Sequence, residues 1–583
     1  MKPMTPMTPM TPMTSSARRL VGVIGVAAVA VALLVNPLDP ATATPPSTST
    51  TFYATSEPVC AAPASPTAFR CMSMRRVRVA KGTTNARAYV VPTGPSAVTH
   101  GPADGLTPRD LATAYGFNST ATGGAQTVAI VDAFNDPRIN ADLQTFDKHY
   151  GLRACTTSNG CLRVVNQHGG TTLPANDTTG WSGEIALDVE TVHSVCQKCH
   201  ILLVEANSES DGDLSAAENT AARLHATEIS NSYGKAEDDL SVADASAYNH
   251  PGIVITAAAG DDGYFDYDDG SINEPEAPAS LNTVVAVGGT SLHLRSTGAR
   301  SSETVWNDNG PQESLGHDKG ATGGGCSTMH PAPLWQSRLT TWASTACGGA
   351  RLVSDVSAVG DYLTGFDTYS SYACSGCHTG WQTIGGTSLS APIIAAMFAL
   401  AGGAHGVAHP ARSLYAHRGS KSLYDVTQGG NGYCAGLAAT SCANPNGGLF
   451  GGGVRDCAYT ANGTPSAGVR ACTALPGYDG PTGLGTPNGL GAFALALPTA
   501  RLAGPGTVRH GTARTWTAHA TDPFPGGAVV SYTWRWGDGT RTVTSKPKAT
   551  HRYRTHRGGR SIRLTVRDNY QASRTVTRHV RVS

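Results

Sequence analysis

Gly385-Gly-Thr-Ser-Leu-Ser-Ala-Pro-Ile393 is the stretch of this 583-residue sequence that says most about its fold. A glycine-rich turn presents Ser388, and Pro392 then opens an apolar run at 393–400, with proline where the first turn of a helix tolerates it. Backbone N–H groups at a helix start can stabilise negative charge that develops in a reaction. The stretch therefore predicts a helix with a nucleophilic serine at its N-terminus, a place called the helix mouth below. The alternative is a serine that only caps the helix.

A near copy of this stretch, Gly288-Gly-Thr-Ser-Leu292, has neither the proline nor the helix. It follows the apolar run at 283–287 and leads into further alternation of apolar and polar residues. We interpret Ser291 as a strand-end residue.

Apolar runs alternate with helical patterns between residues 106 and 498. The runs lie at 126–131, 201–204, 228–232, 253–257 and 283–287, and helical patterns between them include 188–195 and 215–224. Strands separated by helices predict an α/β domain with a parallel sheet and helices on both faces. Active sites of such sheets lie at the carboxyl ends of the strands.

Two acidic residues stand on one predicted helix, in Trp181-Ser-Gly-Glu184-Ile-Ala-Leu-Asp188. Residues four apart share a helix face, with about 5–6 Å between their Cβ atoms. Such carboxylates separate their pKa values, so one can act as a base in acid while the other keeps its proton. The alternative is a solvated helix that carries the pattern by chance.

The segment Ala257-Ala-Ala-Gly-Asp261-Asp-Gly263 resembles the subtilisin-type segment whose asparagine donates to an oxyanion. Here Asp261 stands in the asparagine position. A protonated aspartate can donate a hydrogen bond, whereas an ionised one would repel the oxyanion. Glutamate in place of histidine and aspartate in place of asparagine fit an enzyme that works at low pH.

These separated segments resemble the sedolisin family of serine-carboxyl peptidases over residues 106–498. The resemblance implies a subtilisin-like parallel sheet flanked by helices. It also implies that Ser388 is the nucleophile, Glu184 the general base, Asp188 the residue that orients it and Asp261 the oxyanion partner.

The resemblance extends to a strand and to one further acidic residue. Ile229-Ser-Asn-Ser-Tyr-Gly234 is similar to the family strand that lines the substrate, which implies a substrate-binding role for Ser232, Tyr233 and Gly234, with Tyr233 near the carboxylate pair. Asp132, after the first strand, is either a member of the acidic network or a plain strand-end cap.

Sedolisin-like enzymes also bind one structural calcium ion, and matching segments occur at 423–427 and 475–479. The resemblance implies side-chain ligands from Asp425 and Asp479 and carbonyl ligands from Val426, Leu475 and Gly477. Carboxylates and carbonyls suit this hard cation. The alternative is a pair of turn aspartates without a metal.

The first 105 residues precede the predicted peptidase domain. Lys2, Arg18 and Arg19 stand before an uncharged apolar run at 20–35, and Ala41-Thr-Ala43 fits a cleavage site, so we interpret 1–43 as a signal peptide and the protein as secreted. An uncleaved anchor is the alternative. Residues 44–105 are rich in Pro, Thr, Ser and Ala and predict a short pro-segment or linker. The family usually has a long folded propeptide, whereas only 62 residues (44–105) separate the predicted cleavage site from the predicted peptidase domain.

The 14 cysteines fall into consecutive pairs, which we expect to form disulfides in an oxidising compartment. The pairs are Cys60/Cys71, Cys155/Cys161, Cys196/Cys199, Cys326/Cys347, Cys374/Cys377, Cys434/Cys442 and Cys457/Cys472. Two of them lie in Cys-x-x-Cys-His sequences, for which haem attachment and zinc binding are the less favoured alternatives.

Residues 499–583 differ from the rest of the chain in their pattern of apolar and polar residues and in their charge. Residues 500–583 carry 16 Lys and Arg against 3 Asp and Glu, whereas 106–499 carry 18 against 36. Period-two strands at 528–534, 540–544 and 561–567 predict a small all-β sandwich, and Trp534-Arg-Trp-Gly-Asp-Gly resembles a PKD domain. Such a tail could contact substrate or an acidic surface, or serve as a basic spacer. Nothing favours nucleic-acid recognition.

Taken together, the sequence predicts a secreted endopeptidase that hydrolyses proteins or peptides at acidic pH through a Ser/Glu/Asp triad. A catalytically inactive secreted binding or adhesion protein of the same fold is the main alternative. A histidine-dependent subtilisin is disfavoured, because neither His193 nor His250 has the expected neighbouring motif.

Overall fold

A computed structural model describes most of the chain after residue 47. The described residues are 48–65, 67–83, 86–93, 100–264, 274–308, 320–404, 407–432, 449–450, 454–455, 470–555 and 557–583. The predicted signal peptide lies outside them. Among the described residues, no helix combines the length and the apolar character needed to cross a membrane.

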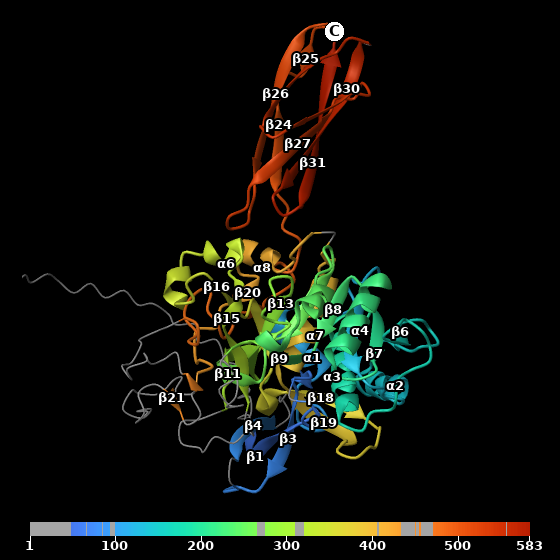
Figure 1. Ribbon diagram of the computed structural model, residues 1–583, viewed down its shortest axis with the longest axis vertical. Helices are drawn as coiled ribbons and strands as arrows, with labels where there is room; N and C mark the ends of the chain where they lie inside the picture. Colours follow the sequence, from blue (N-terminus) through green and yellow to red (C-terminus); the bar gives the residue numbers. More distant parts are fainter. Residues whose placement is uncertain are drawn as a thin grey trace, which may run out of the picture. The chain divides into compact units, whose positions relative to one another are not determined.

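The central element is an eight-stranded sheet (Figure 1). Its strand order is β14-β13-β10-β8-β5-β7-β6, with β17 paired to β13; all neighbours are parallel except β13 and β14. The strands are β5 (Thr127–Ala133), β6 (Leu162–Asn166), β7 (His200–Ala206), β8 (Glu228–Asn231), β10 (Val254–Ala258), β13 (Val285–Leu294), β14 (Arg300–Val305) and β17 (Val356–Val359). All five strands predicted from the apolar runs are present.

Helices cover both faces of this sheet. Successive buried side chains of a strand point to opposite faces, so each face has its own hydrophobic core. Val128 and Ile130 of β5 belong to one core, shared with helices α1 (Pro108–Tyr115), α2 (Ile139–Tyr150), α3 (Trp181–Val195), α7 (Thr387–Leu400) and α8 (Arg412–Ala416). Ala129 and Val131 belong to a second core, shared with α4 (Asp211–Arg223). The α/β prediction is confirmed.

Helix α7 begins at Thr387, which places Pro392 inside the helix and not in its first turn. Proline has no N–H to donate to the carbonyl four residues earlier, which is that of Ser388. The Ser232 hydroxyl lies 3.3 Å from this carbonyl oxygen and can donate to it instead. The sequence prediction of the helix start was therefore late by more than one turn.

Residues 48–93 form strands, which the linker interpretation did not predict. β1 (Thr48–Pro58), β3 (Met74–Val79) and β4 (Arg87–Thr93) complete a five-stranded sheet with β18 (Phe366–Ser370) and β19 (Gly380–Gly385), in the order β18-β19-β3-β1-β4 (Figure 1). β2 (Arg70–Cys71) joins β9 (Tyr233–Ala236) in a separate small sheet. β1 pairs with its neighbours β3 and β4, whereas β2 and β3 also depend on partners about 160–310 residues away, which local composition does not reveal.

Short elements connect the main ones. They are β11 (Asp262–Tyr264), β12 (Glu276–Ala277), β15 (Ala321–Pro331), β16 (Ala350–Val353), β20 (Leu423–Tyr424), β21 (Leu449–Phe450), β22 (Val454–Arg455), β23 (Thr486–Pro487), α5 (Val242–Ala245), α6 (Leu334–Ser337) and the 3-10 turns Glu237–Asp239, Ser246–Tyr248, Trp342–Thr345 and Tyr362–Thr364.

The C-terminal residues form the predicted β-sandwich. One sheet contains β24 (Thr499–Ala503), β26 (Ala513–Thr521) and β29 (Lys548–Arg552); the other contains β25 (Thr507–Val508), β27 (Val529–Arg535), β28 (Arg541–Thr544), β30 (Gly558–Asp568) and β31 (Ser573–Val582). Trp516, Trp534 and Trp536 are fully buried between the sheets.

Five predicted disulfides are present, namely Cys60–Cys71, Cys155–Cys161, Cys196–Cys199, Cys326–Cys347 and Cys374–Cys377. Cys472 is also disulfide-bonded, whereas Cys434, Cys442 and Cys457 lie outside the described residues. Both Cys-x-x-Cys-His pairs are thus oxidised, which leaves no thiolate in either pair for haem or zinc.

Candidate active site

Ser388 lies in the first turn of α7, at the end of the connection from β19. Its hydroxyl donates to the carbonyl of Ser232 (3.1 Å), and its N–H donates to the carbonyl of Met72 (2.8 Å). Gly386 precedes the helix with φ 99°, and a Cβ at this position would collide with the Met72 carbonyl and with Asp261 Oδ2. The backbone at the helix mouth is therefore closely surrounded.

Glu184 and Asp188 are fully buried and one turn apart on α3, which packs against α7. Burial, followed by the nearby Asp132, raises the pKa of Glu184 to about 8, while the Ser73 and Ser388 hydroxyls oppose this increase. Burial, and then the carboxylates of Asp132 and Glu184, raise the pKa of Asp188 well above its ordinary value. The pair therefore retains at least one proton in acid and neutral solution.

Ser232 joins Asp188 to the nucleophile's helix. Its hydroxyl lies 2.8 and 2.9 Å from the two carboxyl oxygens of Asp188 and 3.3 Å from the Ser388 carbonyl. When Asp188 is protonated it can donate to the Ser232 oxygen, and the single Ser232 proton can then go to the Ser388 carbonyl. Protonation of Asp188 thus completes the hydrogen bonding of α7.

Asp132 is a member of the acidic network and not only a strand end. It stands at the carboxyl end of β5, in register with Glu205 of β7. Burial and the Glu205 carboxylate raise the pKa of Asp132 to about 8; burial raises that of Glu205 to about 8 as well. The sequence analysis missed Glu205, although its position at a strand end beside Asp132 is a usable signal.

Asp261 lies on the other side of the helix mouth. Its Oδ1 accepts from the N–H (2.7 Å) and the hydroxyl (2.8 Å) of Thr387, and its Oδ2 has no hydrogen-bond partner among the described residues. Burial raises the pKa of Asp261 well above its ordinary value. A protonated Oδ2 beside the Met72 carbonyl is placed to donate to an oxygen in that position.

The predicted substrate strand, residues 229–234, lies beside the helix mouth. The Ser232 carbonyl accepts from the N–H of Met72 (3.1 Å), and Tyr233 and Gly234 pair with Cys71 and Arg70. The hydroxyl of Tyr233 points into the second core, where it donates to Asn231 (2.7 Å). Its contribution to a groove thus comes from its backbone.

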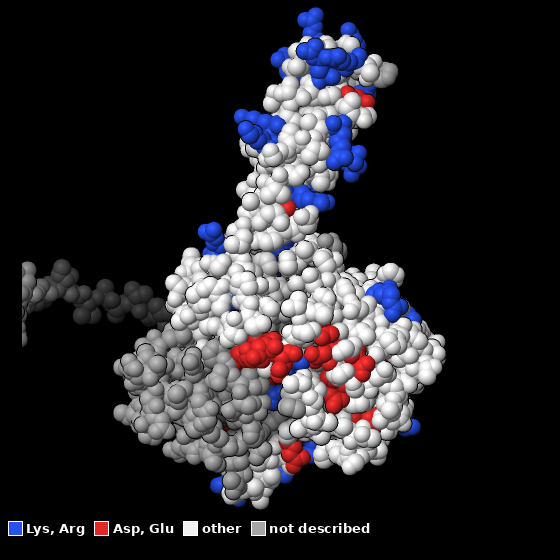
Figure 2. Space-filling view, viewed as in Figure 1, with Lys and Arg blue, Asp and Glu red and all other residues white. Residues whose placement is uncertain are grey.

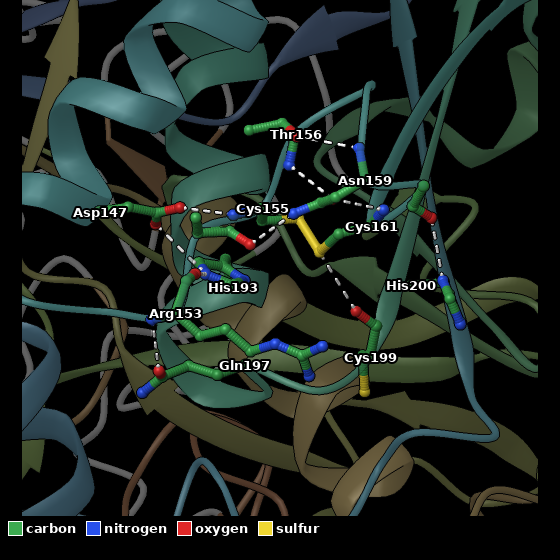
Figure 3. The surroundings of a disulfide bond; sticks show 12 residues. Asp147, Arg153, Cys155, Thr156, Asn159, Cys161, His193, Gln197, Cys199 and His200 are labelled. Atoms are coloured by element: carbon green, nitrogen blue, oxygen red, sulfur yellow. Dashed lines mark hydrogen bonds and ion pairs between the residues drawn. A yellow bond between two sulfur atoms is a disulfide. The ribbon is translucent and has the colours of Figure 1, made fainter.

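Neither histidine considered from the sequence can serve Ser388. Figure 3 shows His193 near the far end of α3, beside Asp147 and the Cys155–Cys161 disulfide. His193 Nε2 lies 2.6 Å from the Arg153 carbonyl, and burial lowers the pKa of His193 to about 4. His250 lies in the turn before β10, at the amino end of that strand. Ser291 lies inside β13, paired with Thr304. Its placement on a strand is confirmed, but the strand continues to Leu294, so its interpretation as a strand-end residue was wrong.

The segments predicted to bind calcium come together. Asp425 Oδ2 accepts from the N–H of Gly477 (2.9 Å), and Asp479 Oδ2 accepts from that of Leu475 (3.0 Å). Burial raises the pKa of Asp479 well above its ordinary value, and Asp425 adds to the increase. Val426 is buried next to Asp425. Two carboxylates at one place suit a hard cation. The described contacts to them come from N–H groups, and the Leu475 carbonyl accepts from Arg470 (3.4 Å).

Parts of the chain are similar to known families and proteins. Residues 168–416 match the Subtilase family, and residues 495–582 match the PKD domain. The chain is 31% identical over 413 residues to kumamolisin from Bacillus sp. (strain MN-32), with 68% of this chain and 65% of that protein covered. It is also 31% identical over 360 residues to sedolisin from Pseudomonas sp. (strain 101), with 57% of each covered.

A solved structure gives the same result. Pseudomonas sedolisin, complexed with two molecules of pseudo-iodotyrostatin, superposes with a TM-score of 0.52 and 27% identity, covering 67% of this chain and 96% of that chain. In both sequence and fold, the chain is similar to peptidases of the sedolisin family.

The chain spans less than two thirds of the length of these curated relatives. It combines a subtilisin-like α/β domain with a C-terminal PKD domain. All four predicted catalytic residues lie around one helix mouth, at the carboxyl side of the sheet. Residues 70–73, which cross this place, were not anticipated.

Figure 2 shows that the sedolisin-like domain gathers Asp and Glu side chains on the face in view, while Lys and Arg are spread over the PKD domain. A groove of about 820 Å³ is lined in part by five acidic residues, namely Asp238, Asp239, Asp261, Asp262 and Glu274. The opposite charges calculated from the sequence thus occur on separate domains.

Proposed function

We propose that this chain is a secreted serine-carboxyl endopeptidase that hydrolyses proteins or peptides in acid. The observation that carries the proposal is that three separate segments surround one helix mouth: Ser388 on α7, Glu184 and Asp188 on α3, and Asp261 after β10. A polypeptide segment, residues 70–73, already lies there in an extended conformation with a carbonyl on the Ser388 N–H.

In the proposed reaction, Ser388 Oγ attacks the substrate carbonyl and passes its proton to Glu184. Asp188 and Asp132 share protons with Glu184, and the number of protons shared sets the net charge of these three carboxyl groups. The Ser388 N–H and protonated Asp261 stabilise the oxyanion. Glu184 then returns the proton to the leaving amine, and water hydrolyses the acyl-enzyme by the reverse sequence.

The acidic working range follows from the raised pKa of Asp261. Below that pKa the carboxyl group donates to the oxyanion, whereas above it the carboxylate repels the oxyanion. To accept the proton of Ser388, Glu184 must be ionised, and the hydroxyls of Ser73 and Ser388 favour this form.

The test is peptide hydrolysis against pH by the chain and by its Glu184→Gln variant. Because residues 70–73 lie across Ser388, the assay is run in parallel in a Cys60→Ala/Cys71→Ala background. We expect hydrolysis in acid that Glu184→Gln abolishes. Equal rates with and without the Glu184→Gln substitution in both backgrounds, or an optimum near pH 8, would contradict the mechanism.

We further propose one structural calcium ion between Asp425 and Asp479, with the carbonyls of Val426, Leu475 and Gly477 as further ligands. It would join the segments at 423–426 and 475–479 and offset their negative charge. Chelation by EGTA should lower the Tm of the wild type, and Asp425→Asn should remove most of that difference. An unchanged Tm on chelation would contradict the site.

The PKD domain is proposed to bring the enzyme to acidic substrates or surfaces, because its net charge is strongly positive. Adsorption of the full chain to a carboxylated polymer should then decrease as salt increases. Adsorption that is absent at low salt would instead favour a spacer.

A further inference from the structure

The five-stranded sheet of the PKD domain has one face on the core of the sandwich and an outer face on the other side. Trp534 of β27 and Leu564 of β30 are fully buried in that core. On β28, the Thr542 hydroxyl accepts from the indole N–H of the buried Trp536 (2.9 Å). Successive side chains of a strand point to opposite faces, so the residues before and after Trp534, Leu564 and Thr542 lie on the outer face.

Three arginines stand in one row across this outer face. Arg535 of β27 is directly opposite Arg541 of β28 on one side and Arg563 of β30 on the other. All three side chains are exposed. Neighbouring strands are only about 4.7–4.9 Å apart, and like charges directly opposite each other destabilise a sheet. The row therefore opposes folding, and an anionic ligand bound along it would remove the repulsion.

None of the acidic residues of this domain neutralises the row. Lys and Arg predominate over the domain in Figure 2, and residues 500–583 contain only three acidic residues. Asp538 Oδ2 lies 2.8 Å from Nε2 of His551, which belongs to the other sheet. Asp568 is fully buried, and Asp522 lies in the loop after β26, a strand of the other sheet. Within the described part of the chain, the three arginine side chains have no hydrogen bond or ion pair, so their guanidinium groups are available to a ligand.

Hydroxyl groups lie beside the arginine row. Thr533 of β27 is opposite Thr565 of β30, which is opposite Thr575 of β31, and the hydroxyls of Thr565 and Thr575 are 2.7 Å apart. The arginine row itself continues onto Thr577 of β31. Among the described residues of these strands, no Phe, Tyr or Trp lies on the outer face. The face thus combines a row of guanidinium groups with a layer of short hydroxyl side chains.

These features favour an acidic polysaccharide over other polyanions. The planar fork of arginine binds a carboxylate through two parallel hydrogen bonds. Threonine hydroxyls can both donate to and accept from the hydroxyls of a sugar. Single-stranded nucleic acids are bound largely by aromatic side chains that stack on their bases, which this face does not present. An acidic polypeptide has carboxylates but no comparable set of hydroxyls for the threonines to bind.

We propose that this outer face binds a linear polysaccharide with a carboxylate on each sugar, with Arg541, Arg535 and Arg563 holding neighbouring carboxylates and the threonines bonding to sugar hydroxyls. The proposal rests on the proposed role of the PKD domain in bringing the enzyme to acidic substrates or surfaces, and it names the partner and the site. Residues 106–499 carry 18 Lys and Arg against 36 Asp and Glu, so the peptidase domain repels the same polymer. Attachment through the PKD domain therefore leaves the active site to protein substrates.

The test measures the affinity of the full chain for immobilised polygalacturonate at low salt and pH 6, where the carboxylates of the polymer are ionised. Arg535→Gln/Arg541→Gln/Arg563→Gln removes the row. We expect the apparent Kd to rise by about tenfold, because three exposed ion pairs are lost. All forms carry Glu184→Gln, so that a polypeptide probe can be compared without being hydrolysed.

The control variant removes the same charge from the other sheet. Arg501 of β24 and Lys548 and Arg552 of β29 are exposed there, and none of them is directly opposite another. Arg501→Gln/Lys548→Gln/Arg552→Gln therefore matches the net charge of the first variant without altering the row. Its apparent Kd should remain close to that of the parent.

A second variant separates loss of binding from loss of folding. Arg535→Glu places a carboxylate between Arg541 and Arg563, so two repulsions across the strands become two attractions. We expect its Tm to be at least that of the parent, while its affinity for polygalacturonate decreases. Unchanged affinity in this variant overturns the site.

The outcomes separate this site from the attachment role on which it rests. Equal losses of affinity in the row variant and in its control overturn the site, but leave adsorption through net charge standing. Tighter binding by the parent to polyglutamate or to single-stranded DNA than to polygalacturonate overturns the polysaccharide as partner. Absence of binding by the parent to all three polymers overturns the attachment role of the PKD domain itself.

Discussion

Glu184 is a buried carboxyl group whose proton affinity is set by its neighbours, so its substitution tests the chemistry directly. Glu184→Gln keeps the shape of the side chain but removes the base, and we expect kcat/KM at pH 4 to fall by about 10²–10⁴-fold in the Cys60→Ala/Cys71→Ala background. Glu228→Gln is the control, because Glu228 is equally buried but lies at the amino end of β8. Comparable losses in both variants would show a folding effect.

Asp261 allows a second test at the residue scale. Asp261→Asn keeps an acceptor for Thr387 and supplies an N–H donor at every pH. The pH at which kcat falls on the alkaline side should therefore be higher than in the parent. Asp261→Ala removes the donor and should lower kcat by about 10²–10³-fold throughout. The measurement is kcat against pH in the same background. An unchanged high-pH limb in Asp261→Asn would show that Asp261 does not set it.

At the scale of elements, α7 combines an internal proline with a hydroxyl that serves its unpaired carbonyl. Ser232→Ala should destabilise the chain by about 1 kcal/mol or more, since the Ser388 carbonyl and Asp188 both lose a partner. In a Pro392→Ala background, residue 392 supplies its own N–H to the Ser388 carbonyl. Ser232→Ala should therefore lower the free energy of unfolding by a smaller amount there. Urea unfolding of the four forms gives the coupling energy. Strict additivity would mean that Ser232 does not replace the missing helix bond.

The elements also show what the sequence could and could not predict. Ser388 and Asp261 were predicted because turn and strand-end motifs are local, and Glu184 and Asp188 because helical spacing places them on one face. Strands β1 to β4 were not predicted, because residues 75–79 alternate only briefly and become a strand by pairing with β1 and β19. The same holds for Met72 and Ser73, whose role depends on contacts with residues 232 and 388.

At the scale of the whole molecule, buried carboxyl groups make stability depend on pH. The pKa values of Asp132, Glu184 and Glu205 are raised to about 8 in the folded chain, against ordinary values near 4. The folded state therefore binds more protons than the unfolded state between these values, and its stability decreases as pH rises from about 4 to 8. We expect Tm, measured by calorimetry with the same ionic strength throughout, to decrease over this range.

Glu205→Gln checks the source of this dependence. Its side-chain oxygen can still accept from the Asp136 N–H, as Glu205 does (3.1 Å), but it cannot ionise. The variant should match the wild type at pH 4 and exceed its Tm at pH 8. The control is Glu209→Gln, on the partly exposed loop after β7. A Tm that is independent of pH in the wild type would contradict the retained protons.

The ladder between β1 and β3 has a consequence for how the chain is handled in the laboratory. Cys60 and Cys71 both precede the Met72–Ser73 bond and are bonded to each other, so no disulfide could join the two fragments of a chain nicked there, and only non-covalent contacts such as the β1–β3 ladder would hold them. Such a sample would migrate as one species under native conditions, yet divide into two in detergent even without a reducing agent. A preparation judged intact by its native size alone could therefore already have been cut.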